Sequence, residues 1–185
     1  MSTIAQTSAA MKRLKTIWND KNITLKAKIS LMRTLVLSIF LYACESRTLT
    51  ADLEKRIQAA EMRCFRKILG ITYRGHVTNE EVWNRIKQTT GPHEDLLTTG
   101  KKRKLKWYGH VSRSLGLAKT ILQGTVQGGR KRGRQKKRWQ DNIREWTGLP
   151  VKDTVKKTKD EKVGERWLPD HLLCPYGHPD YGIHI

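Results

Sequence analysis

The sequence predicts an all-α protein: a small helical bundle, then a basic flexible linker, a last short helix and a loosely ordered C-terminal tail. Two observations support this class. Apolar residues recur at helical spacing in several segments, most clearly over residues 24–43 and 51–69. No segment of useful length alternates polar and apolar residues as a half-buried strand would, and no internal repeat is present.

Two long helices are expected in the first half of the chain. The segment from Thr24 to about Ala43 carries one apolar stripe. The segment from about Ala51 to Leu69 has acidic residues in its first turn and Gly70 as its stop. The stripe residues are Ile29, Met32, Val36, Ile39 and Phe40 in the first helix and Leu53, Ile57, Ala60, Cys64 and Ile68 in the second.

Shorter helices are expected further along the chain. Thr78 and Glu81 match a capping box, which predicts a helix over residues 79–87. Another helix is expected around Tyr108, and a last one over residues 137–146, before a glycine and a proline. Its apolar side chains recur at helical spacing, which favours packing onto the bundle over gripping a base or a partner; they are Trp139, Ile143 and Trp146.

We therefore expect five segments. They are an N-terminal connector (1–22), a helical domain (23–116), a basic linker (117–138), a short Trp-faced helix (139–150) and a poorly ordered tail (151–185).

The charge of the chain indicates a polyanionic partner. Its 37 Lys and Arg against 17 Asp and Glu give a formal net charge of +20. A chain this positive repels itself unless something neutralises it, so nucleic acid is the first candidate and an acidic membrane surface the second. We expect no membrane-spanning segment and no membrane partner, because the best apolar run, Leu35–Cys44, is about half the ~20 residues that a spanning helix needs.

Cysteine usage and the N-terminus indicate an intracellular protein. Cys44, Cys64 and Cys174 are too few and too scattered for a disulfide framework. The N-terminus lacks the apolar core and the cleavage site of a signal peptide. A reduced compartment, nucleus or cytoplasm, is therefore expected. Cys44 and Cys64 lie on apolar faces and are expected to be packing residues.

The strongest functional signal is a long basic window. From Lys101 to Arg138 there are fourteen Lys or Arg and no Asp or Glu. Each cation can displace a counterion from a phosphate, so this window predicts nucleic-acid binding in preference to a solvated charged face or a nuclear-localisation signal. Arg132-Gly133-Arg134 resembles a minor-groove hook but lacks the usual following proline, which favours general phosphate contact.

The side chains expected to contact nucleic acid come from both ends of this window. The cations are candidates for phosphate contact, and the two aromatic residues could stack on unpaired bases. They are Lys101, Lys102, Arg103, Lys104, Lys106, Trp107, Tyr108, Arg130, Lys131, Arg132, Arg134, Lys136, Lys137 and Arg138.

Neither a metal site nor a catalytic site is expected. Cys174 with His171, His178 and His184 invites a zinc interpretation, but structural zinc usually takes two closely spaced pairs richer in thiolates, and an unstructured tail is favoured. No phosphate-cradling glycine loop, nucleophile motif or metal-binding set of carboxylates is present. The chain is therefore not expected to be an enzyme or to hold a cofactor.

Several blocks resemble the reverse transcriptases of LINE-type (non-LTR) retrotransposons. Leu41-Tyr-Ala-Cys-Glu-Ser-Arg-Thr-Leu49 resembles the L-Y-G-C-E-T-W-T-L block that follows the palm domain in that family. Arg103-Lys-Leu-Lys-Trp-Tyr-Gly-His-Val111 resembles its K-L-x-W-x-G-H-V block, and Gly129 to Trp139 its G-R-R-x-G-R-P-x-x-R-W block. The likeness covers roughly residues 5–150 in order. Ala43 and Arg47 depart from the usual glycine and tryptophan.

The resemblance implies a thumb-like domain over 23–116 followed by a basic tail. In this family the thumb holds the RNA–DNA hybrid behind the palm, and the basic region contacts template RNA or target DNA. The palm's paired aspartates are absent from these residues, so the resemblance implies RNA, DNA or hybrid binding without chemistry, with palm and fingers as partners. The Mg²⁺ of polymerisation would belong to the parent polymerase. An independent DNA- or RNA-binding regulator and a non-functional retroelement relic remain as alternatives.

Overall fold

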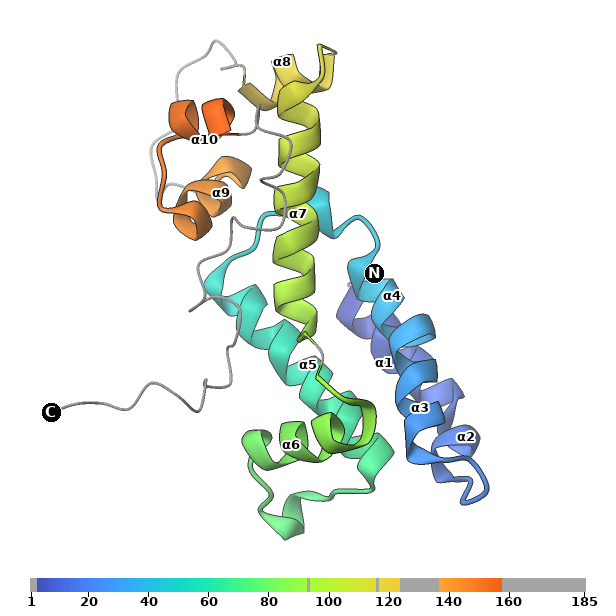
Figure 1. Cartoon of the computed structure of the whole chain (residues 1–185). Coiled ribbons are helices and arrows are strands. Elements are labelled where there is room, and N and C mark those ends of the chain that lie inside the picture. The colour runs from blue at the N-terminus through green and yellow to red at the C-terminus, as the bar shows by residue number, and fades with distance from the viewer. Residues whose placement is uncertain (1–2, 93, 116, 124–136, 158–185) are drawn as a thin grey trace, which may run out of the picture. The chain divides into compact units, whose positions relative to one another are not determined.

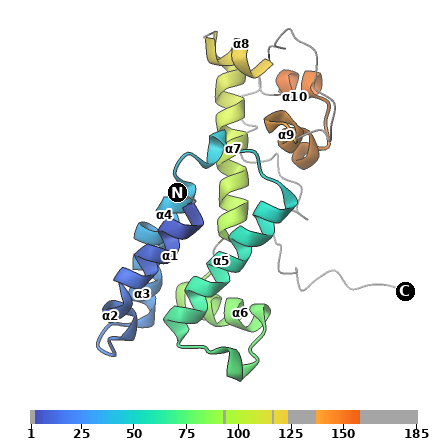
Figure 2. The ribbon, with the colours of Figure 1, turned by 180° about the vertical axis from the view of Figure 1, so that it is seen from behind.

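The computed structural model describes residues 3–92, 94–115, 117–123 and 137–157 (Figures 1 and 2). All regular secondary structure in these ranges is helical and none of it is strand, which confirms the all-α class. The chain forms two compact units. The described residues of the first lie within 3–42 and 51–98, and those of the second within 43–50 and 99–157. The units divide after residues 42 and 50 and again inside helix α7 (Leu96–Arg113).

The first unit begins with two helices where a connector was expected. Helices α1 (Thr3–Arg13) and α2 (Lys15–Asn19) bury Met11 and Trp18, which are each 3% exposed. The indole Nε1 of Trp18 donates a hydrogen bond of 3.0 Å to the carbonyl oxygen of Met11. The connector prediction is therefore wrong, because these apolar residues belong to the core of the unit.

The expected helix over 24–43 is present as a continuous helical run with a π-helical centre. It comprises α3 (Leu25–Leu31), a π-helical segment (Met32–Leu37) and α4 (Ser38–Leu41), and α1 runs alongside it in both views (Figures 1 and 2). The wider π turns change which residues face inward. Leu37 is buried and Ile39 only half-buried, whereas the other expected stripe residues are buried: Ile29, Met32, Val36 and Phe40.

This run, extended to Ser46, also meets the length and composition expected of a membrane span. Leu25–Ser46 spans 22 residues with a mean hydropathy of 1.5, which corrects the expectation that no segment could cross a bilayer. A core helix meets the same criterion, and the inward face of this run lies in the core of the first unit. The finding is weak support for a membrane.

Helices α5 (Ala51–Leu69) and α6 (Asn79–Thr90) complete the core of the first unit. The predicted bounds of α5 are confirmed, and it stops at Gly70, whose φ of 68° is left-handed. The hydroxyl of Thr78 accepts the amide hydrogen of Glu81 at 3.2 Å, as expected for the cap of α6. The rings of Phe65 and Trp83 meet edge to face across the two helices, 5.8 Å apart.

The second unit contains a 3-10 turn (Cys44–Ser46), most of α7, and helices α8 (Leu117–Gln123), α9 (Trp139–Thr147) and α10 (Val151–Lys157). Helix α8 lies in the expected linker and α10 in the expected poorly ordered tail, so both expectations are wrong at these residues. Helix α9 is close to its predicted bounds and ends at Gly148, with a φ of 66°. The expectations for 124–136 and 158–185 lie outside the described residues.

Candidate nucleic-acid interface

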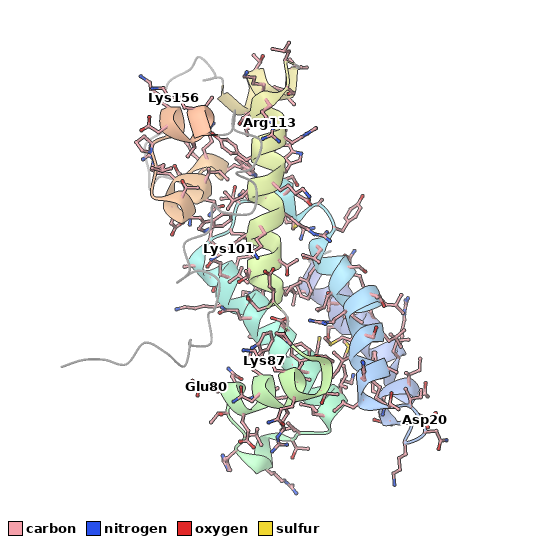
Figure 3. All side chains as sticks on the ribbon, in the orientation of Figure 1. Asp20, Glu80, Lys87, Lys101, Arg113 and Lys156 are labelled. Carbon is pink, nitrogen blue, oxygen red and sulfur yellow. The ribbon has the colours of Figure 1, made fainter. Side chains whose placement is uncertain are left out.

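Helix α7 presents two different faces in the second unit. Its buried positions and its exposed positions each recur at spacings of three and four residues, as expected for an amphipathic helix. Lys101 and Arg113 mark the two ends of this part of the helix in Figure 3. The exposed positions are mostly cationic or aromatic: Arg103, Lys106, Trp107, His110 and Arg113. The buried positions are Lys101, Lys104, Leu105, Tyr108, Val111 and Ser112.

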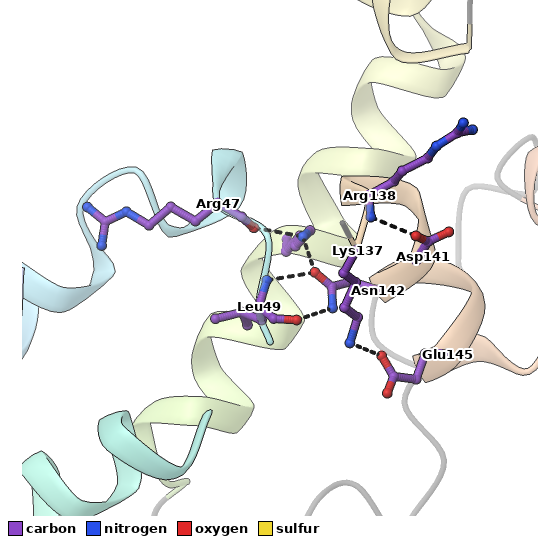
Figure 4. A network of polar contacts seen from close by, with 8 residues as sticks. Arg47, Leu49, Lys137, Arg138, Asp141, Asn142 and Glu145 are labelled. Atoms are coloured by element: carbon purple, nitrogen blue, oxygen red, sulfur yellow. Dashed lines mark hydrogen bonds and ion pairs between the residues drawn. The ribbon is translucent and has the colours of Figure 1, made fainter. Parts of the chain in front are cut away.

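Lys104 is fully buried, although the basic window predicted a phosphate contact there. Its Nζ donates hydrogen bonds of 2.8 Å to the carbonyl oxygen of Arg47 and to Oδ1 of Asn142 (Figure 4). Nζ also lies 4.5 Å from the ring centroid of Trp139 and 5.4 Å from that of Trp146. The expectation for Lys104 is corrected, because all of these contacts anchor the side chain inside the unit.

Burial, and after it the nearby charge of Lys137, lower the pKa of Lys104 to about 7. The two hydrogen-bond acceptors and the two tryptophan rings favour the charged ammonium in the opposite sense. Lys104 is thus a buried amine that the folded chain protonates less readily than a free lysine, and its Nζ donates to fixed acceptors.

Asn142 is the partner of Lys104 that the sequence analysis missed. Its side-chain amide makes two bonds to the backbone of Leu49: the Leu49 amide donates to Oδ1 at 2.8 Å, and Nδ2 donates to the Leu49 carbonyl at 2.7 Å. Asn142 is fully buried. A polar residue beside the predicted apolar stripe of Trp139, Ile143 and Trp146 was a signal that could have identified it.

Two further predicted contact residues are also buried. Lys101 is 6% exposed, and its Nζ lies 5.4 Å from the ring centroid of Trp146. Tyr108 is 1% exposed, and its hydroxyl shares a hydrogen bond of 3.0 Å with the hydroxyl of Thr154. Tyr108 therefore presents no ring face for a base, and its predicted stacking role is corrected to a packing role.

Trp107 differs from Tyr108 because 37% of it is exposed. Its ring meets the ring of Trp139 nearly edge to face, at a centroid distance of 5.4 Å and an interplanar angle of 73°. Trp139 is itself held, because its Nε1 donates a hydrogen bond of 2.7 Å to the carbonyl oxygen of Glu45. Trp107 thus rests on a fixed neighbour while part of its surface faces solvent.

At the start of α9 the two described cations have different environments. Lys137 makes an ion pair with Glu145, which offsets its charge (Figure 4). Arg138 is exposed, and its backbone amide donates a hydrogen bond of 2.6 Å to Oδ2 of Asp141. The other candidates from this end of the window lie outside the described residues: Arg130, Lys131, Arg132, Arg134 and Lys136.

Exposed cations in the second unit extend beyond the predicted set. Arg103 and Lys106 are exposed and Lys102 is half-buried, so these three predicted residues remain accessible on α7. The sequence analysis missed several exposed cations because they lie outside the densest basic runs. Helical spacing from Arg103 and Lys106 would have identified Arg113. The missed cations are Arg113, Arg144, Lys152 and Lys156, the last of which is labelled on α10 in Figure 3.

The first unit contains a buried acidic pair that the sequence analysis did not predict. Glu61 and Asp95 are 1% and 2% exposed. Oε1 of Glu61 accepts the amide hydrogen of Leu96 at 3.1 Å, whereas its Oε2 has no hydrogen-bond partner. Burial, and after it the nearby Asp95, raise the pKa of Glu61 to about 8, against the opposing effects of the Leu96 amide and Arg33. The sequence signal for a buried Glu61 was its position directly after Ala60, a residue of the predicted apolar stripe.

Within the described ranges no three His, Cys, Asp or Glu side chains are grouped so as to hold a metal ion. The Cys174 and histidine group lies outside those ranges. Cys64 is buried and Cys44 half-buried, and both are free thiols. No protein-family model, no curated protein and no solved structure matches this chain.

Proposed function

We propose that this chain is the thumb-and-tail segment of a LINE-type reverse transcriptase, and that it binds nucleic-acid phosphates without chemistry of its own. One observation carries the proposal: the acid-free window 101–138 includes a helix face on which cations are exposed. Arg103 and Lys106 lie on that face, one helical turn apart. Each such cation would replace a counterion condensed on the phosphate backbone.

The buried contacts of α7 support binding by a preformed surface. Lys104, Tyr108 and Lys101 fix the opposite face of the helix, so the exposed cations need no large rearrangement to meet a ligand. A surface that is ordered before binding loses less entropy on association. Lys104 then contributes to nucleic-acid binding through the position of its helix and makes no phosphate contact itself.

The order of the resembling blocks supports the family part of the proposal. They follow one another from Leu41 to Trp139 as in LINE-type polymerases. RNA, DNA or an RNA–DNA hybrid would be the ligand, and the palm and fingers of a polymerase would be the protein partners. The intracellular location, nucleus or cytoplasm, belongs to the same proposal.

Salt-dependent binding tests the proposal directly. Fluorescence anisotropy would measure the affinity of the whole chain for labelled RNA–DNA hybrid, duplex DNA and single-stranded RNA at low and moderate salt. With six to ten phosphate contacts, affinity should drop roughly 10³–10⁵-fold between about 50 and 200 mM salt. Absence of binding even at the lower salt would overturn the proposal and leave the retroelement relic as the better interpretation.

A charge-matched pair of variants locates the interface. Replacing Arg103 and Lys106 together by glutamine should reduce the salt slope by about 2, because each lost contact removes nearly one released counterion. Replacing Lys12 and Arg13 by glutamine removes the same charge from exposed positions of α1 in the first unit and should change the slope less. Equal effects of the two double variants would show that net charge alone, and no particular face, binds the nucleic acid.

The gene tests the family part separately. We expect the DNA immediately upstream of the Met1 codon to encode a palm domain with a paired-aspartate strand, in frame or frameshifted. Upstream DNA with no trace of a palm would favour an independent binding protein.

A further inference from the structure

We infer that the α7 surface takes single-stranded nucleic acid, with Trp107 as the residue that stacks on an unpaired base. This inference rests on the proposed function and names the ligand more narrowly. Trp107 lies on the exposed face of α7, with Arg103 one turn before it and Lys106 directly before it in the chain. A base on the indole would therefore leave its flanking phosphates within reach of cations on the same helix.

The surroundings of Trp107 favour a stacking role over simple packing. A tryptophan that only filled a core would be covered, as Trp146 is at 2% exposure, whereas Trp107 is 37% exposed. Its contact with Trp139 is steep, at 73°, so the Trp139 ring does not lie flat against the Trp107 ring. The exposed part of Trp107 is therefore available in the absence of a ligand.

The same contact holds the indole in place before binding. Trp139 is fixed by its hydrogen bond to Glu45 and by the ammonium of Lys104, which lies 4.5 Å from its ring centroid. Trp107 rests on this fixed ring, so fewer side-chain rotamers are lost when a base arrives. Base-to-aromatic stacking is tolerant of sequence, since every base has a π-face, but it requires a base that is not already paired within a duplex.

Abasic strands separate stacking from phosphate binding. An oligonucleotide with normal bases and one of equal length whose central nucleotides are abasic carry the same phosphates. The wild-type chain should bind the strand with bases more tightly, by about 5- to 150-fold for one stacked base. Replacing Trp107 by leucine should remove this preference and leave affinity for the abasic strand unchanged. Replacing Trp107 by phenylalanine, which keeps an aromatic ring, should retain part of it.

Controls make each outcome decisive. Tyr42 is an aromatic side chain of the first unit with 77% exposure, and its replacement by leucine should leave the preference intact. A Trp107→Leu chain that still prefers the strand with bases would overturn the inference. Equal weakening toward both strands would also overturn it, because it would indicate a structural role of Trp107. Failure of the wild-type chain to bind the abasic strand in a salt-dependent way would instead reject the phosphate-binding proposal itself.

Discussion

Lys104 and Asn142 are joined by a buried hydrogen bond of 2.8 Å between Nζ and Oδ1, and that same oxygen accepts the amide hydrogen of Leu49. One side chain of α9 thereby connects helix α7 with the extended segment that follows the 3-10 turn. Both polar atoms of the Asn142 side chain, Oδ1 and Nδ2, are hydrogen-bonded to buried groups. Loss of one partner would therefore leave a buried polar atom unsatisfied.

Removing the Asn142 amide should destabilise the second unit. Asn142→Ala leaves the amide and carbonyl of Leu49 without their side-chain partners and removes one acceptor from the Lys104 ammonium. We expect the free energy of unfolding to fall by about 3 kcal/mol, as for buried polar groups left unsatisfied. Denaturant titration followed by tryptophan fluorescence measures it. Asn79→Ala, at an exposed position of the first unit that accepts a bond from Arg66, should cost less than about 1 kcal/mol.

The pH dependence of stability should contain a Lys104 component. Its pKa is about 7 in the folded chain because of burial, against an ordinary value of 10.5. Between these values the unfolded chain binds more protons than the folded one. The contribution of Lys104 to stability therefore rises with pH across this window and is lost as pH falls through about 7.

Lys104→Met removes that component while filling most of the same volume. From pH 7 to pH 9 the unfolding free energy of the wild type should rise relative to that of this variant, by up to about 1.4 kcal/mol per pH unit. Lys106→Met, at an exposed position of the same helix, should show no such trend. Parallel pH profiles for wild type and Lys104→Met would contradict the prediction.

Glu61 should give the first unit the opposite pH dependence. Burial and Asp95 raise its pKa from 4.5 to about 8. The folded chain then holds a proton that the unfolded chain releases, so this contribution is complete below pH 4.5 and is lost as pH rises through 8. Glu61→Gln keeps an acceptor for the Leu96 amide and cannot ionise. Thermal unfolding over pH 5–9 should show a smaller alkaline decline for this variant, with Glu80→Gln as the exposed control. An unchanged decline would count against a buried, protonated Glu61.

Local patterns predicted the helices well where a cap, a stop and a stripe agreed. The bounds of α5 and the Thr78 cap of α6 depend on interactions between residues that are close in the sequence. The connector and linker predictions failed at α1, α2 and α8 because these short segments have no long apolar stripe with a recognisable start and stop. The π-helical turns were not predictable from a stripe drawn at 3.6 residues per turn.

The candidate site was predicted by composition but not by orientation. Charge density identified the α7 segment, yet it gave Lys104 and Arg103 the same role, although the structure buries one and exposes the other. Burial of a lysine depends on partners distant in sequence, here the carbonyl of Arg47 and the amide of Asn142. A helical wheel anchored on Leu105 and Tyr108 would have separated the two faces, but it could not have identified those partners.

Ala43 should be a strained position whose replacement by glycine stabilises the chain. It has a φ of 51° and a ψ of 29°, in the left-handed region where a Cβ costs roughly 1–2 kcal/mol. The resembling family block has glycine at this point, so the departure noted in the sequence falls where the backbone favours glycine. Ala43→Gly should raise the free energy of unfolding by about 0.5–1 kcal/mol, because relief of strain outweighs the added freedom of the unfolded chain. Ala59→Gly is the matched control: at this exposed position inside α5 the same substitution should cost about 1 kcal/mol. If both variants lose stability to the same extent in denaturant titrations, the left-handed conformation at Ala43 is not a source of strain.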